Sequence, residues 1–260
     1  MSITADILPA YAGAPVARTR LHVDGVPGGA EWRVIGQAGG HEWVAAHEVS
    51  TGSGRWLTDP MAPLGMEAVY ELRYGSVVES SVPVSRPAAG SDLVTSLDGR
   101  TVARVARMAD GGDAWSWGAS LALLDIPGSA PVARYGQPSA PTGGMVAHTS
   151  GHDTRTLAAM VAAGGPLVVL HDQSVCEIDG CDIAPGLRVS LTGHDAERTG
   201  RVDIAERSWS LSWSEARPPW RYTAPVATWA DVHRHFGTVG AVRASGLTHE
   251  QVAAGDWLSW

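Results

Sequence analysis

Lysine and asparagine are missing from this sequence of 260 residues, so all 19 of its basic side chains are arginine. Both missing residues use A-rich codons, and we interpret their absence as the mark of a GC-rich genome rather than as a functional feature. Phenylalanine is almost missing as well, with one residue against 11 tryptophans, and cysteine occurs only twice. The hydrophobic content of 44% is still that of a globular protein with a sizeable core.

Three further absences exclude whole classes of protein. No apolar run reaches the length of about 18 residues that a membrane-spanning helix needs, so we expect no membrane insertion. The first residues, MSITADILPAYAG, have neither the basic nor the apolar region of a signal peptide, so none is expected. The net charge of -8 argues against nucleic-acid binding, because phosphate recognition requires an excess of positive charge.

Recognisable catalytic motifs are also missing. The chain has no Gly-rich dinucleotide loop, no phosphate-binding P-loop and no G-x-S-x-G nucleophile motif. His41, Glu42 and His47 have the wrong spacing for the H-E-x-x-H zinc motif, and their segment resembles a strand. We therefore predict no enzymatic activity, no cofactor and no catalytic residue.

The two cysteines flank an Asp-Gly pair at 179–180, which is a preferred hairpin turn. Such a turn would place Cys176 and Cys181 on facing strands. Two buried thiols are the expected state, and a disulfide is the alternative. A zinc site would need further ligands, for which His171 and Asp172 are the local candidates, so it is not predicted.

Short apolar runs separated by turn residues dominate the chain, which has 31 glycines and 16 prolines. This pattern predicts a mostly β protein with two tandem β-sandwich domains, the second with a short helix, and a short helical C-terminal tail. The segment at 86–92 resembles a linker. The predicted parts are an irregular N-terminal arm at 1–13, a first sandwich at 14–88, a second sandwich at 89–222 and a helical docking segment at 223–260.

Within the first sandwich, Leu64 precedes Tyr70 by six residues, and Trp32 lies on an early strand. This resembles the fibronectin type III pattern, in which a Leu precedes a strand-opening Tyr that forms a tyrosine corner. Trp32 takes the place of the core tryptophan. We therefore expect these three residues to define the fold of the first sandwich.

One helix is predicted in the second sandwich. Asp153 is expected to be its N-cap, and Leu157, Ala158, Val161 and Ala162 form its apolar stripe. Gly164 and Gly165 should end the helix, since Pro166 prevents its continuation. Three strands follow, and in the last of them Trp209, Leu211 and Trp213 alternate with serines and are expected to face the core.

The C-terminal segment has two short helix patterns, with Thr228 and Thr248 as caps. Helices this short are marginal in water and need a surface to lie on. Trp229, Trp257 and Trp260 are therefore predicted to lie at an assembly interface.

The order of these motifs resembles the minor tail proteins, of the distal-tail type, of siphophages that infect actinobacteria. In that family a short helix leads through a Gly-Gly-Pro turn into an apolar strand, as at Asp153–Leu170 here. A closing strand with the pattern R-x-W-x-L-x-x-x-E-x-x-x-P follows, and a TWADV sequence comes after it. The matching residues here are Arg207, Trp209, Leu211, Glu215, Pro219 and the segment Thr228–Val232.

This resemblance covers residues 89–235 and leaves the N-terminal third outside the pattern. It implies a virion protein of the tail tip or baseplate, without enzymatic activity, that forms a ring of copies of itself, six-fold by the resemblance. Its other partners would be tail proteins such as the tube, the hub and the tape measure. Its position as distal ring, hub or accessory protein is left open, and a carbohydrate-binding module that contacts host cell-surface glycan is the alternative function.

Overall fold

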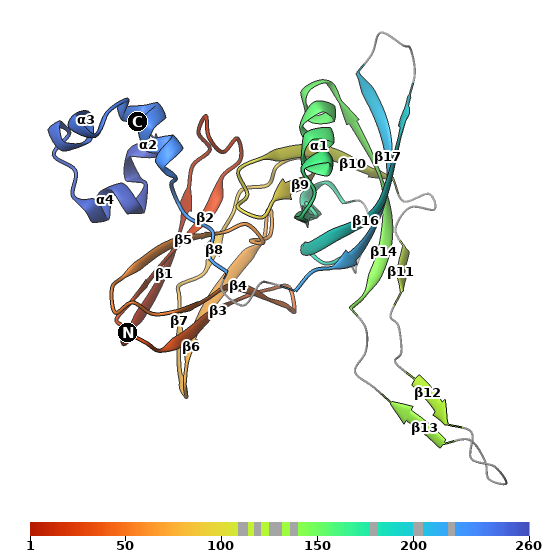
Figure 1. The fold of residues 1–260 in the computed structure, drawn as a ribbon, viewed down its shortest axis with the longest axis horizontal. Helices are drawn as coiled ribbons and strands as arrows, with labels where there is room; N and C mark the ends of the chain where they lie inside the picture. Colours follow the sequence, from red (N-terminus) through yellow and green to blue (C-terminus); the bar gives the residue numbers. More distant parts are fainter. Residues whose placement is uncertain are drawn as a thin grey trace.

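Strands make up most of the computed structural model, which folds into two β units followed by short helices at the C-terminal end (Figure 1). We call strands β1–β8 the first β unit and strands β9–β17 the second β unit. The prediction of a mostly β chain, with one helix in the second β unit and short helices at the end, is confirmed. The structure describes residues 1–108, 114–116, 121–124, 132–135, 140–176, 181, 183–199, 205–217 and 222–259.

The first β unit is a sandwich of two antiparallel sheets. One sheet has the strand order β1-β2-β5 and the other has the order β4-β3-β6-β7, with the short β8 beside β6. Its strands are β1 (Ser2–Leu8), β2 (Arg18–Asp24), β3 (Glu31–Ala38), β4 (His41–Val49), β5 (Arg55–Asp59), β6 (Glu67–Tyr74), β7 (Val77–Ser80) and β8 (Val84–Ser85).

The N-terminal residues are part of this sandwich, so the prediction of an irregular arm at 1–13 is wrong. β1 pairs with β2 along its whole length, from Ser2 opposite Asp24 to Leu8 opposite Arg18. Ile3 and Leu8 are buried. The alternation of apolar and polar residues in β1 was too short a signal to separate from a loop without its partner strand.

Trp32 lies in the core between the two sheets, as predicted, with only 3% of its surface exposed. Tyr70 is fully buried in the same core, but it lies in the middle of β6 and not at its start. Its hydroxyl donates to a carboxylate oxygen of Asp59 at 2.9 Å. This differs from the predicted tyrosine corner, in which the hydroxyl forms a hydrogen bond with the backbone.

The second β unit is a sheet that closes on itself. Its strand order is β10-β9-β15-β16-β17-β14, and β10 also pairs with β14, so six strands form a barrel-like sheet. β11 extends the pairing along β14, and β12 and β13 form a separate projecting hairpin (Figure 1). The strands are β9 (Asp92–Ser96), β10 (Val102–Met108), β11 (Ala114–Ser116), β12 (Leu121–Leu124), β13 (Val132–Tyr135), β14 (Thr142–Ser150), β15 (Pro166–Leu170), β16 (Gly186–Arg198) and β17 (Glu206–Glu215).

The predicted helix is α1 (Gly151–Ala163), and it ends as expected, since Gly164 has a positive φ of 68° and Pro166 opens β15. Asp153 is not its N-cap. Ser150 takes that position without a side-chain hydrogen bond, and Asp153 instead accepts a hydrogen bond of 3.0 Å from the backbone N–H of Arg104. A tertiary contact with β10 therefore replaced the local cap.

The face of α1 that packs on the sheet also differs in part from the prediction. Leu157 is buried and Val161 packs against the core, as predicted, whereas Ala158 and Ala162 face solvent. Thr154 and Met160 are buried in their place. The sheet below α1 contributes Trp209, Leu211 and Trp213, which are all buried and alternate with serines as predicted.

A third apolar cluster joins the two β units. It contains Met61 and Leu64 from the first β unit together with Leu93 and Leu170 from the second. Leu64 therefore packs at the junction and not in the sandwich core. The predicted linker at 86–92 is also fixed in place, because the buried Arg86 donates to the backbone carbonyls of Ala17 and Ala62 at 2.7 and 2.9 Å.

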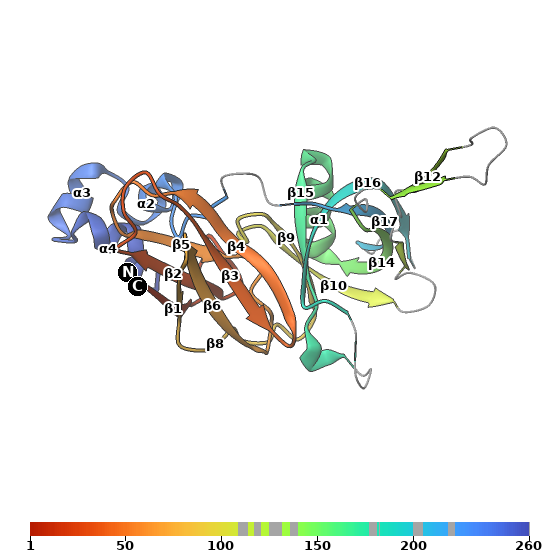
Figure 2. The same cartoon turned by 90° about the horizontal axis from the view of Figure 1, so that it is seen from below.

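The C-terminal segment forms three short α-helices and a 3-10 turn that pack against the first β unit (Figures 1 and 2). The predicted caps are present, since the hydroxyls of Thr228 and Thr248 accept hydrogen bonds from the third residues of their helices. None of the helices in the described part of the chain is long and apolar enough to cross a membrane. The elements are α2 (Trp229–Phe236), α3 (Val239–Ala244), α4 (His249–Ala254) and η2 (Asp256–Ser259).

Candidate functional site

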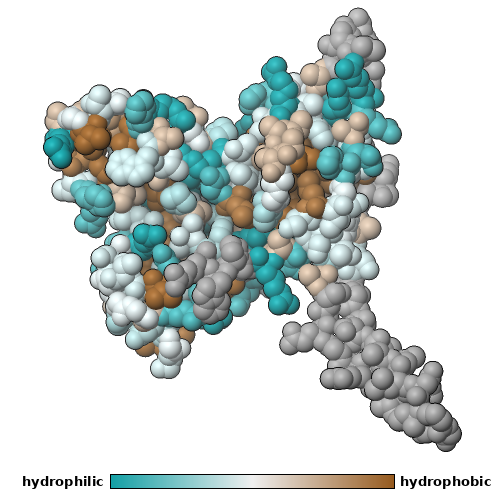
Figure 3. All heavy atoms as spheres, viewed as in Figure 1, coloured by the Kyte–Doolittle hydropathy of each residue, from teal (hydrophilic) through white to brown (hydrophobic). Residues whose placement is uncertain are grey.

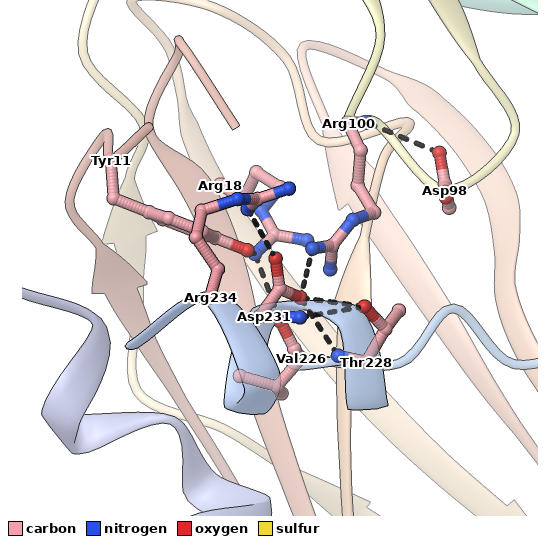
Figure 4. Close-up of polar contacts among 8 residues, drawn as sticks. All are labelled: Tyr11, Arg18, Asp98, Arg100, Val226, Thr228, Asp231 and Arg234. Atoms are coloured by element: carbon pink, nitrogen blue, oxygen red, sulfur yellow. Dashed lines mark hydrogen bonds and ion pairs between the residues drawn. The ribbon is translucent and has the colours of Figure 1, made fainter. Parts of the chain in front are cut away.

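A buried carboxylate lies where the C-terminal segment meets both β units (Figure 4). Asp231, in the first turn of α2, has 1% of its surface exposed and accepts hydrogen bonds of 2.8 Å from the backbone N–H and the hydroxyl of Thr228. It also forms ion pairs with Arg100, on the β9–β10 turn, and with Arg234 at 3.0 Å. Burial alone would raise the pKa of Asp231, but the hydrogen bonds from Thr228 and Arg100 outweigh it, and the pKa is lowered.

Arg18 approaches the same place from β2 of the first β unit. Its guanidinium is buried and donates to the hydroxyl of Tyr11 at 3.2 Å and to the carbonyl of Val226 at 3.0 Å. Burial lowers the pKa of Arg18. We call the cluster of Tyr11, Arg18, Arg100 and Asp231 the polar junction, because it ties the first β unit, the second β unit and the C-terminal segment together.

Backbone pairing beside the polar junction reinforces this connection. Tyr222 and His47 exchange backbone hydrogen bonds of 2.8 and 2.9 Å, and the N–H of Thr58 donates to Ala224. The hydroxyl of Tyr222 donates to the carbonyl of Leu97 in the second β unit at 2.7 Å, and burial raises its pKa to about 12. The residues at 222–224 therefore extend along β4 and β5 and cover part of these two edges.

The three tryptophans predicted at an interface have different environments. Trp257 is completely buried against Leu8 and Val226 of the same chain, so its prediction as an interface residue is wrong. Trp229 has 78% of its surface exposed and is available to a partner. Trp260 lies outside the described residues. Sequence alone could not separate Trp257 from Trp229, because the surface that covers Trp257 comes from the other end of the chain.

Three further exposed apolar side chains lie at or just beside one edge of the sandwich. β7 is an edge strand of its sheet, and all four of its residues are exposed. Val77 and Val78 are 43% and 55% exposed, and Val82 just after the strand is 69% exposed. Among the described residues on the face drawn in Figure 3, apolar side chains form separate small patches.

The two cysteines lie close to His171 in the connection between β15 and β16. The imidazole nitrogen of His171 and the two sulfur atoms of Cys176 and Cys181 all lie within 4.8 Å of one another. The Sγ atom of Cys181 is 3.5 Å from Nε2 of His171. No disulfide joins the two cysteines, which are half-buried, while the Asp-Gly turn predicted between them lies outside the described residues.

A second layer of polar contacts holds this His–Cys–Cys cluster. Nδ1 of His171 is 3.0 Å from the buried carboxylate of Asp92, which also accepts from the backbone N–H of Asp172 at 2.8 Å. The hydrogen bond with Asp92 raises the pKa of His171 against the effect of burial. The sequence offered His171 as a nearby candidate metal ligand. It gave no indication that Asp92, which lies 79 residues earlier, would contact that histidine.

Four other histidines, in β4, α1 and β16, lie apart from this cluster. His41 and His47 lie on β4, which is a strand as expected, and His47 contacts Glu31 at 2.8 Å. His152 lies in the first turn of α1 and His194 lies in the exposed part of β16, so the structure does not bring them into one site.

No protein-family model matches this chain, and the comparison with curated proteins gives no match either.

Proposed function

We propose that this chain is a structural protein of a bacteriophage tail tip or baseplate, located in the virion, which assembles with copies of itself into a ring. Its other partners would be neighbouring tail proteins such as the tube, the hub and the tape measure. The proposal rests on the order of motifs from Asp153 to the TWADV sequence, and the mostly β fold is compatible with it. The strand orders β1-β2-β5 and β4-β3-β6-β7 also fit a fibronectin type III-like sandwich at the N-terminal end.

The observation that best supports assembly is the uncovered edge strand β7. Exposed edges offer unpaired backbone groups to other chains, and monomeric proteins usually protect them with charges, prolines or covering segments. Residues 222–224 pair with β4 and β5, whereas β7 is exposed along its length and presents Val77 and Val78 beside Glu79. We assign the β7 edge to contact with a different surface of a second copy of this chain, because such head-to-tail contacts form a ring when the rotation between copies closes.

The oligomeric state in solution tests this assignment. Size-exclusion chromatography with light scattering should give one fixed oligomer for the native protein. Val78→Arg should convert it to a monomer by placing a charge in the contact. Ala162→Arg is the matched control, because Ala162 is also an exposed apolar residue but lies on α1 of the second β unit. A native monomer at every concentration, or a Val78→Arg protein that still assembles, would contradict the role of β7.

Location in the virion needs a separate test. Mass spectrometry of purified virions should detect the chain in a fixed ratio to the other tail proteins, and imaging with a label on the chain should place it at the tail tip. Its absence from purified particles would refute the proposed function, whatever its oligomeric state in solution.

A carbohydrate-binding module is the second candidate, and the exposed indole of Trp229 favours it. An exposed aromatic ring can stack on the face of a sugar. Cell-wall polysaccharide should then retain the native protein, while Trp229→Ala should pass through and Val239→Ala should be retained. Equal behaviour of all three proteins would exclude this role for Trp229.

A further inference from the structure

We propose that His171, Cys176 and Cys181 bind one zinc ion, with the fourth position of a tetrahedral site left for solvent or an external ligand. These residues provide one imidazole nitrogen and two sulfur atoms, all within 4.8 Å of one another. Imidazole and thiolate are the ligands that zinc prefers. Two thiolates would also balance the charge of a divalent cation, which matters because the site is partly buried.

The spacing of the ligand atoms fits a metal ion between them. Zinc–sulfur and zinc–nitrogen bonds of about 2.3 and 2.0 Å at a tetrahedral angle place the two ligand atoms about 3.5 Å apart. The separation between Sγ of Cys181 and Nε2 of His171 is 3.5 Å. The pair can therefore take up a zinc ion with little movement of either side chain.

Asp92 holds His171 in the form that a metal requires. A ligating histidine commonly donates its second ring N–H to a carboxylate, which fixes the tautomer and the direction of the ring. Nδ1 of His171 lies 3.0 and 3.2 Å from the two carboxylate oxygens of Asp92. With the proton on Nδ1, the lone pair of Nε2 points toward Cys181. This arrangement of carboxylate, histidine and two thiols is the strongest argument for a built site.

The backbone around the ligands is anchored as well. The fully buried Asp172, next to His171, accepts hydrogen bonds from the backbone N–H groups of Ala89 and Gly90 at 2.7 and 2.8 Å. Its carboxylate also accepts a hydrogen bond of 3.0 Å from the N–H of Ser174 and so caps the 3-10 turn η1 (Gln173–Val175). Cys176 follows directly as the C-cap of this turn. Two of the three ligands therefore lie on a short, fixed segment.

Metal content is the direct measurement. Protein without a histidine tag, purified under reducing conditions, should retain about one zinc per chain after exposure to zinc and exhaustive dialysis. Cobalt in place of zinc should give the intense thiolate-to-metal absorption of a site with cysteine ligands. Cys176→Ser, Cys181→Ser and His171→Ala should each lose both signals. Asp92→Asn should keep the ligands but bind zinc about 10- to 100-fold more weakly.

The matched control is His152→Ala, which removes a histidine outside the cluster and should retain native zinc binding. Circular dichroism spectra that match the native protein would show that the ligand variants still fold. Two results would overturn the proposal. One is native protein that retains no zinc although both cysteines are reduced. The other is zinc that remains bound in folded Cys176→Ser and Cys181→Ser proteins.

Discussion

The first β unit is an open sandwich, whereas six strands of the second β unit close into a barrel-like sheet. Closure gives each of the six strands a partner on both sides over part of its length, although β16 beyond Ser190 pairs with β17 alone. The sandwich keeps its edges, and the C-terminal segment covers part of β4 and β5. For the proposed assembly, we therefore expect contacts through the sandwich, whose edge strand β7 is exposed along its whole length.

Both β units nevertheless share one packing feature between neighbouring strands. A glycine lies directly opposite a tryptophan on the neighbouring strand, at Gly36 and Trp43 in the sandwich and at Gly143 and Trp213 in the barrel. A Cβ atom added to either glycine would come within 2.3 Å of the indole ring. The glycines therefore leave space for an aromatic ring to lie across the strand.

The largest expected effect tests whether the C-terminal segment is part of the first β unit. Trp257→Ala should lower the free energy of unfolding by about 3–5 kcal/mol, because it opens a cavity against Leu8 and Val226. Trp229→Ala is the matched control and should change it by less than about 0.5 kcal/mol, since this indole is exposed. Urea unfolding measures both. A small effect of Trp257→Ala would mean that the segment is only loosely attached.

The next effect tests how the segment ties the two β units together. Asp231→Asn should destabilise the protein by about 3 kcal/mol at neutral pH, because Arg100 loses its buried partner. The folded-state pKa of Asp231 is lowered, so its stabilising contribution is present above the unfolded pKa and is lost as the pH falls. The difference between the two proteins should therefore shrink below about pH 4. A difference that does not depend on pH would contradict this assignment.

A smaller effect probes the barrel alone. Gly143→Ala should cost about 1–3 kcal/mol, because the new methyl group would lie 2.3 Å from both the carbonyl of Ala114 and the Trp213 ring. Gly193→Ala provides the control in β16, where the nearest atoms, on Ser212, are 3.7 Å or more away. Thermal unfolding should separate the two variants. Equal melting temperatures would show that the strand yields easily at Gly143.

The smallest effect belongs to the sandwich core. Tyr70→Phe removes one donor from the buried Asp59 carboxylate, which keeps its bonds from Trp43 at 2.8 Å and from the N–H of Met61 at 2.9 Å. The loss should be about 1 kcal/mol. Urea unfolding of this variant, with Tyr74→Phe on the same strand as control, measures it. A loss as large as that of Trp257→Ala would show that Asp59 depends on Tyr70 far more than its other donors suggest.

Features with a local cause were predictable from the sequence. The end of α1 follows from Gly164, Gly165 and Pro166, because backbone freedom and a missing N–H act on neighbouring residues only. The inward orientation of Trp209 and Leu211 follows from the alternation of side chains along one strand. The caps of the C-terminal helices belong to the same class.

Features that depend on distant residues were not predictable. Asp153 is a residue type favoured at an N-cap, yet its carboxylate accepts a hydrogen bond from the backbone of Arg104 in β10. Trp257 is a large aromatic residue of the kind found at interfaces, but in the folded chain it is buried against Leu8. The His–Cys–Cys cluster shows its orientation only once Asp92 is placed beside His171. Each of these outcomes needs tertiary contacts across 49 or more residues, for which one sequence carries little signal.

The fixed connection at 86–92 has a consequence for how the molecule responds to heat or force. Arg86 binds the carbonyls of Ala17 and Ala62, and Asp172 holds the backbone of Ala89 and Gly90. Neither β unit can come apart without disturbing groups that stabilise the other, so the chain should melt in a single cooperative transition. A load applied to one β unit would then pass directly to the other without first extending a flexible tether.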